Sequence, residues 1–158
     1  MTVTKVLLAS DANWVIDEVS AALSDPGTEL KVLRAGLDVR PAVSLSKPDL
    51  VILDLQIGNM GGMATCLDLR LESEVGRLPY IPVLILLDRE ADLYLAQQAK
   101  ADGWLVKPID AFRLKMAAVK LLSGEKMSAA SEVPVIVSDE VPPVDQASDS
   151  DIEVSSSP

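Results

Sequence analysis

The chain has 158 residues, of which 49% are hydrophobic and only 3% aromatic, so it can form one aliphatic core plus an extension. Its formal net charge of −10 argues against direct binding to nucleic acid or to an anionic membrane surface. Histidine is absent and Cys66 is the single cysteine, which disfavours zinc sites and an internal disulfide. Without a long apolar run or a signal peptide at its start, the chain is expected to be cytoplasmic, with no direct membrane insertion.

Strand-like and helix-like segments alternate from residue 4 to about residue 123. The expected strands, which are rich in apolar residues, are Thr4–Ala9, Glu29–Arg34, Leu50–Asp54, Val83–Leu87 and Trp104–Val106. The expected helices, several with apolar residues at helical spacing, are Asp11–Leu23, Val39–Leu45, Met63–Val75, Arg89–Ala101 and Asp110–Leu122. This alternation predicts a parallel sheet with helices on both faces.

Three side chains in these helices carry specific expectations. We expect Trp14 to pack in the core, with a second anchor for a partner as the alternative. Cys66 is expected to be a small buried hydrophobe, with Leu71 on the same side of its helix. In Leu93-Tyr94-Leu95, three consecutive apolar residues cannot all face one side of a helix, so at least one of them is expected to be exposed.

The composition changes after Gly124. Eight acids and one base give residues 125–158 a net charge of −7, and this segment contains no aromatic residue. We therefore expect residues 1–123 to form the folded domain and residues 124–158 to be an acidic disordered tail. Within the tail, Val135, Ile136 and Val137 belong to a β-branched run. That run is either a chance apolar stretch in a linker or a short strand that docks on a partner's sheet edge.

Charged residues follow three of the predicted strands. Asp11 follows the first strand, Asp54 ends the third, and Lys107-Pro108 follows the fifth. The carboxyl ends of parallel strands meet at one edge of the sheet, where open α/β sheets bind their ligands. The sequence therefore predicts that two carboxylates and one lysine lie together at this edge.

Taken in this order and spacing, together with the glycine-closed loop Asp54–Gly62, these residues resemble the receiver domain of two-component response regulators. The resemblance covers residues 4–122. It implies a flavodoxin-like (βα)5 doubly wound parallel sheet with strand order 2-1-3-4-5. It also implies that Asp54 accepts a phosphoryl group from a histidine kinase and that Lys107 pairs with that group.

The resemblance implies further roles for residues around Asp54. Asp11, Asp54 and the backbone carbonyl of Gln56 would hold Mg²⁺. A cis peptide bond would precede Pro108. Leu87 and Trp104 would occupy the two positions through which such domains transmit phosphorylation to their surface.

Several residues depart from the pattern of the family. Ser10 stands where a second acid is usual, which weakens the expected Mg²⁺ site because a hydroxyl is a neutral ligand. Leu87 stands where a Thr or Ser is usual, and leucine cannot donate a hydrogen bond to a phosphoryl oxygen. Trp104 is bulkier than the usual Tyr or Phe. These departures affect both metal binding and signal transmission.

We therefore expect an atypical single-domain receiver that acts as a protein-interaction or regulatory module and not as an enzyme. Phosphorylation would be reduced or dispensable. The expected partner face is the fourth helix and fifth strand, with Leu93, Tyr94 and Trp104, or else the tail; the alternative for these three residues is that they belong to the core. The partner could be a larger multi-subunit assembly on which this chain docks as an accessory subunit. Because only the tail follows residue 123, no DNA-binding output domain is expected.

Three alternatives remain open at this point. Asp54 could be the working acceptor of a phosphorelay. Asp54 and Lys107 could instead form a purely structural salt bridge. A small hydrolase or nucleotide-binding protein on the same fold is a third alternative, which the lack of histidine and of a glycine-rich phosphate loop disfavours.

Overall fold

The computed structural model of the protein describes residues 3–128, which contain five strands and five α-helices. The strands are β1 (Thr4–Ala9), β2 (Thr28–Leu33), β3 (Leu50–Asp54), β4 (Val83–Leu87) and β5 (Gly103–Val106). The α-helices are α1 (Asn13–Ala22), α2 (Val39–Ser46), α3 (Gly62–Glu74), α4 (Leu93–Gln98) and α5 (Ala111–Leu122). Two 3-10 turns, η1 (Gly36–Asp38) and η2 (Glu90–Asp92), precede α2 and α4.

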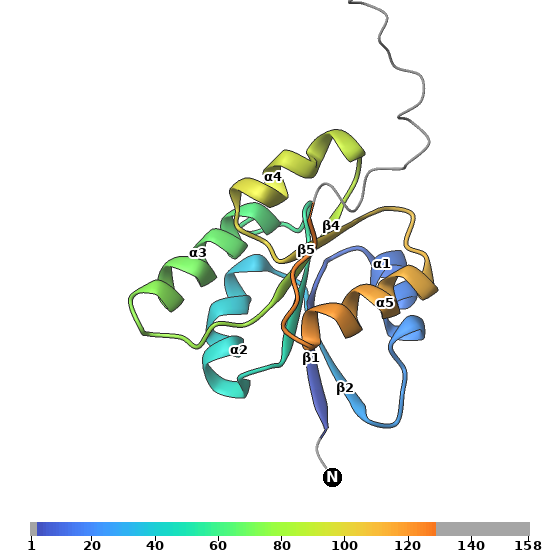
Figure 1. Cartoon of the computed structure of the whole chain (residues 1–158), viewed down its shortest axis with the longest axis horizontal. Coiled ribbons are helices and arrows are strands. Elements are labelled where there is room, and N and C mark those ends of the chain that lie inside the picture. Colours follow the sequence, from blue (N-terminus) through green and yellow to red (C-terminus); the bar gives the residue numbers. More distant parts are fainter. Residues whose placement is uncertain (1–2, 129–158) are drawn as a thin grey trace, which may run out of the picture. The chain divides into compact units, whose positions relative to one another are not determined.

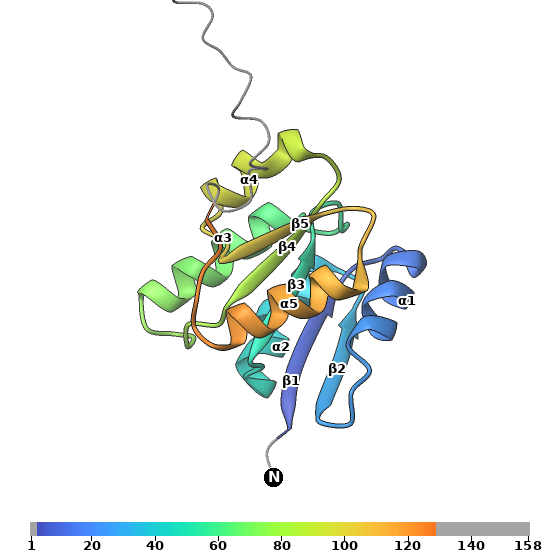
Figure 2. The ribbon, with the colours of Figure 1, turned by 45° about the vertical axis from the view of Figure 1, so that its right-hand side comes forward.

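The five strands form one parallel sheet in the order β2-β1-β3-β4-β5. Helices α1 and α5 cover one face of the sheet, and α2, α3 and α4 cover the other (Figures 1 and 2). This architecture confirms the predicted doubly wound fold and its strand order. Both faces of the sheet are covered, so every residue of β3 and β4 is buried, which explains their continuous apolar sequences.

The two sides of the sheet have separate aliphatic cores. Alternate residues of one strand belong to different cores: Leu53 packs on the side of α2 to α4, whereas Ile52 packs on the side of α1 and α5. The period-2 alternation of strands therefore divides one apolar run between two helix layers.

The segment before β5 differs from the single helix predicted over Arg89–Ala101. Residues Glu90–Asp92 form a 3-10 turn, and the preceding Arg89 donates hydrogen bonds from its backbone N–H and its guanidinium to the Asp92 carboxylate. Helix α4 covers only Leu93–Gln98. Lys100 adopts a left-handed conformation (φ 64°), which no α-helix can continue through. The helix therefore begins later and ends earlier than its apolar spacing suggested.

The compact unit of the chain reaches Met127, beyond the predicted end at residue 123. The Met127 N–H donates to the carbonyl oxygen of Asp102 (2.8 Å), and the Met127 sulfur lies 3.4 Å from the Trp104 nitrogen. The first residues assigned to the tail thus pack against the start of β5. The predicted docking segment Val135–Val137 lies outside the described residues.

Helices long and apolar enough to cross a membrane do not occur within residues 3–128.

Candidate functional site

The structure brings the three predicted site residues to the carboxyl edge of the sheet. Asp54 ends β3, Lys107 follows β5, and Asp11 follows β1. The Lys107 Nζ lies 2.6 Å from Asp54 Oδ1, and the Asp54 side chain is only 2% exposed. The expected juxtaposition of Asp54 and Lys107 is therefore present as a buried ion pair.

Both carboxylate oxygens of Asp54 accept hydrogen bonds from the protein. The hydroxyl of Ser10, itself fully buried, donates to Oδ2 (2.8 Å). The backbone N–H of Gln56 donates to Oδ1 (3.1 Å), the oxygen that also binds Lys107. Ser10 is thus a direct hydrogen-bond partner of Asp54, which stabilises this carboxylate in place.

The loop after β3 needs glycine where it turns back over Asp54. A Cβ added to Gly62 would lie 2.6 Å from the carbonyl oxygen of Asp54 and 2.8 Å from the Cα of Leu55. Any side chain at position 62 would therefore push the backbone of Asp54 out of place. Asp11 contacts the same loop, since its Oδ2 accepts the N–H of Gly58 (3.0 Å).

The residues around Asp54 do not fit a tightly bound Mg²⁺ ion. Within residues 3–128, no group of three or more acidic, cysteine or histidine side chains is arranged to hold a metal. Asp11 and Asp54 are the only acids of the predicted set, and Ser10 adds a neutral oxygen that already donates to Asp54. Both carboxylate oxygens of Asp54, and Oδ2 of Asp11, already accept hydrogen bonds from the protein.

Lys107 has a second carboxylate partner that the sequence reasoning missed. Its Nζ lies 3.0 Å from Asp88 Oδ1, and the Trp14 ring centroid lies 5.8 Å from the same nitrogen. Burial alone would lower the pKa of Lys107, but hydrogen bonds and charges from Asp54 and Asp88 raise it above its ordinary value. Asp88 could have been found in the sequence, since it directly follows the fourth predicted strand at the same edge.

The two predicted transmission positions lie in the core. Leu87 is 0% exposed, and Trp104 is 5% exposed. The prediction that Trp104 contributes an exposed contact to a partner face is therefore wrong, because its ring packs against the apolar side chains between the sheet and α4. The peptide bond between Lys107 and Pro108 is cis, as expected.

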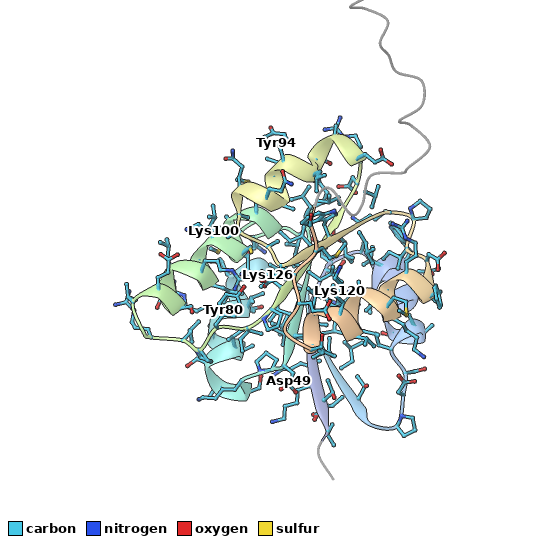
Figure 3. The ribbon with its side chains drawn as sticks, in the orientation of Figure 1. Asp49, Tyr80, Tyr94, Lys100, Lys120 and Lys126 are labelled. Carbon is cyan, nitrogen blue, oxygen red and sulfur yellow. The ribbon has the colours of Figure 1, made fainter. Side chains whose placement is uncertain are left out.

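Among the other predictions about exposure, the structure agrees with some and contradicts others. Tyr94 is 59% exposed and projects from α4 away from the sheet (Figure 3), whereas Leu93 is partly buried against the core. Trp14 is 50% exposed, so its predicted place in the core is wrong: Val15 and Val19 take the core-facing positions of α1. Leu71 is 59% exposed and does not share the buried side of Cys66. Burial raises the pKa of the Cys66 thiol to about 12, which agrees with an unreactive side chain.

A second charged cluster, also missed from the sequence, lies where β5 begins. Asp102 is 2% exposed and accepts hydrogen bonds from the Arg70 guanidinium, the Tyr80 hydroxyl and the Val83 N–H. Lys126 lies 3.6 Å from the same carboxylate and 5.3 Å from the Tyr80 ring centroid (Figure 3). This cluster joins α3, the start of β4 and the residues after α5. Its members are far apart in sequence and charged, so no local pattern marks them as buried.

Comparison with known proteins agrees with this fold. The profile of the response regulator receiver domain matches residues 6–119. The chain belongs to the response regulator receiver domain family. The transcriptional regulatory protein CseB of Streptomyces avermitilis is 29% identical over 109 residues, which are 68% of this chain and 44% of CseB. The chain thus spans less than half of the length of this curated relative.

Solved structures share the fold. The chemotaxis response regulator CheY4 of Vibrio cholerae superimposes with a TM-score of 0.66 at 24% identity, over 77% of this chain and 99% of that one. The receiver domain of sensor histidine kinase PA1611 from Pseudomonas aeruginosa gives a TM-score of 0.68 at 17% identity, over 78% of this chain and all of that one. That relative was solved with a magnesium ion coordinated in its active site cleft. Receiver domains are generally signalling modules that interact with histidine kinases and other proteins.

Proposed function

We propose that this chain is an atypical receiver that acts through protein contacts and for which phosphorylation of Asp54 is reduced or dispensable. The observation that carries this proposal is the state of Asp54. Its carboxylate is 2% exposed, and its two oxygens accept hydrogen bonds from Ser10, Gln56 and Lys107. A carboxylate attacks a phosphoryl donor through one of its oxygens, and burial together with these bonds restricts the approach of a donor to Asp54. The fully buried Leu87 supplies no hydroxyl to stabilise the product.

A working phosphorelay acceptor is the second candidate, because Asp54, Asp11 and Lys107 do lie at one edge of a receiver fold. This candidate requires that the Ser10 hydroxyl and the Lys107 ammonium rearrange before transfer. The hydrolase and nucleotide-binding alternatives gain no support from the residues around Asp54.

Partner binding requires an exposed surface, and α5 offers one besides Tyr94 on α4. Phe112, Met116 and Val119 are 71%, 52% and 61% exposed and recur at helical spacing on the side of α5 opposite its buried residues. Between residues 111 and 122 the charged residues are all basic: Arg113, Lys115 and Lys120. We therefore propose that a protein partner with an acidic, partly apolar helix binds here, for instance a subunit of a larger assembly.

The test replaces the protein in its own cells by full-length variants and measures cross-linked partners. The Asp54→Asn variant cannot be phosphorylated. It should retain the wild-type partners, because the proposal makes phosphorylation dispensable for binding. Met116→Asp should lose them because it places a negative charge among the bases of α5. Leu71→Asp makes the same kind of change on α3, where the side chain is also exposed, and should retain them.

The opposite result would favour the phosphorelay. If wild-type protein carries an acyl phosphate and Asp54→Asn loses every partner, phosphorylation is required and the proposal is wrong.

A further inference from the structure

Asp88 is the acidic residue near the site that no expected role explains. It directly follows β4, and its Oδ1 lies 3.0 Å from Lys107 Nζ, which is also bound to Asp54. One ammonium group therefore faces two carboxylates. Asp11, at the same edge, adds a third negative charge. The immediate surroundings of Lys107 are already negative before any ligand arrives.

The second oxygen of Asp88 lies in an unfavourable environment, so the position of this carboxylate carries a desolvation cost. Asp88 Oδ2 is buried, and no hydrogen-bond donor within residues 3–128 reaches it. A buried oxygen without a donor is unfavourable, so the attraction to Lys107 must offset its desolvation. The nearest following cation, Arg89, is bonded to Asp92 instead. Lys107 is thus the group that holds Asp88.

We propose that Asp88 is a built-in anion for Lys107 and that it keeps external phosphoryl-like anions away from Asp54. This inference rests on the proposed function, because it gives a cause for reduced phosphorylation. A phosphoryl group carries about −1.5 to −2 charges at neutral pH. It would meet the carboxylate of Asp88 as a like charge and would have to share Lys107 with it.

The geometry also separates Asp88 from the other departures of this site. Leu87 removes a hydrogen-bond donor, and Ser10 removes a metal-binding charge, but neither adds a negative charge beside Lys107. Asp88 alone among these three does so. If Asp88 is the block, neutralising that one carboxylate should restore anion binding while Leu87 and Ser10 remain.

The experiment titrates the full-length protein with beryllofluoride in the presence of Mg²⁺ and measures binding by ¹⁹F NMR. The variants are Asp88→Asn and Asp88→Ser, two replacements in case one of them perturbs folding, which circular dichroism checks. The matched control is Glu90→Gln, which removes the same charge from an exposed side chain of the same segment. Asp54→Asn in the Asp88→Asn background shows whether binding takes place at Asp54.

We expect Asp88→Asn and Asp88→Ser to bind beryllofluoride at least about tenfold more tightly than the wild type, as removal of one adjacent like charge predicts. Glu90→Gln should match the wild type, and the added Asp54→Asn change should abolish the gain. The pKa of Lys107, followed by NMR of its side chain, should fall when Asp88 is neutralised.

Three results would overturn the inference, and each has a different meaning. If wild type and both Asp88 variants bind equally weakly, Asp88 is not the block, while the proposed function stands. If the wild type and both variants all bind beryllofluoride tightly, both this inference and the proposal of reduced phosphorylation fail. A gain that Glu90→Gln shares would also overturn it, since the effect would then be general charge.

Discussion

Lys107 is the residue on which the geometry of the site depends. It is the cation bonded to Asp54, whose side chain is 2% exposed, and to Asp88, whose Oδ2 accepts no hydrogen bond from the described residues 3–128. A buried ion pair adds little net stability when complete, but removing one member leaves an uncompensated buried charge. Lys107 therefore compensates the buried charge of Asp54 as well as belonging to the candidate site.

Replacing Lys107 by methionine tests this at the residue scale. The Lys107→Met variant keeps the length of the side chain and removes its charge, so we expect a loss of about 3–5 kcal/mol in the free energy of unfolding. Denaturant unfolding measures it. Lys115→Met is the control, because Lys115 forms an exposed pair with Asp25 at 3.5 Å. It should change stability by less than about 1 kcal/mol. Equal effects of the two changes would refute a special role for Lys107.

The difference in stability between the wild type and Lys107→Met should depend on pH. The pKa of Lys107 is raised in the folded state, so its protonated form stabilises the fold. That contribution is complete below the unfolded value of about 10.4 and is lost as pH rises through the folded pKa. The stability difference between wild type and Lys107→Met should therefore be constant from about pH 7 to 9 and shrink above about pH 10.

Sequence patterns at this scale identified some residues and missed others for physical reasons. Asp54 and Lys107 were predictable because strand ends converge at one edge of a parallel sheet. Trp14 and Trp104 were placed the wrong way round, since an apolar side chain at a helix start or in an edge strand is compatible with either burial or exposure. Asp88 also follows a predicted strand at this edge, but its ion pair with Lys107 joins residues far apart in the sequence and leaves no local pattern.

At the scale of elements, β5 is held by charged groups at both of its ends. Asp102, just before it, binds Arg70 and Tyr80, and Lys107, just after it, binds Asp54. The strands themselves were predictable from continuous apolar runs. The short α4 was not, because the left-handed Lys100 and the turn at Glu90–Asp92 leave no mark in apolar spacing.

The Arg70 cluster should be a main source of stability for this end of the sheet. Arg70 is 5% exposed and donates to the carbonyl oxygens of Lys100 and Ile81 as well as to Asp102. Arg70→Met should therefore cost about 3–5 kcal/mol in thermal or denaturant unfolding.

A matched control separates burial from charge. Arg40→Met also breaks an Arg–Asp pair, with Asp68 at 2.8 Å, but the Arg40 side chain is 51% exposed. It should cost less than about 1 kcal/mol. A similar cost for both arginines would mean that burial does not set the contribution of the Arg70 cluster.

At the scale of the whole molecule, the described part is a receiver fold with two charged clusters at opposite edges of one sheet. The edge with Asp54 carries the candidate functional site. The edge with Asp102 also binds residues that follow α5, through Lys126 and Met127. The family profile ends at residue 119, so this last contact lies beyond the residues that the profile matches.

The position of Met127 can be tested by shortening the chain. A protein that ends at residue 128 should unfold at the same denaturant concentration as the full chain. A protein that ends at residue 123 should be less stable, because it loses the Met127 side chain that packs against Gly103 and the bond to Asp102. Equal stability of the two shortened proteins would show that these contacts contribute nothing.

That contact also has a consequence for solubility. β5 is an edge strand, and the backbone N–H of Trp104 is covered by the sulfur of Met127. Uncovered strand edges pair with strands of other molecules and lead to aggregation. A recombinant receiver cut at residue 119 or 123 would expose this edge. The loss of the Met127 contact would then be noticed first as precipitation of the protein during purification and not as altered signalling.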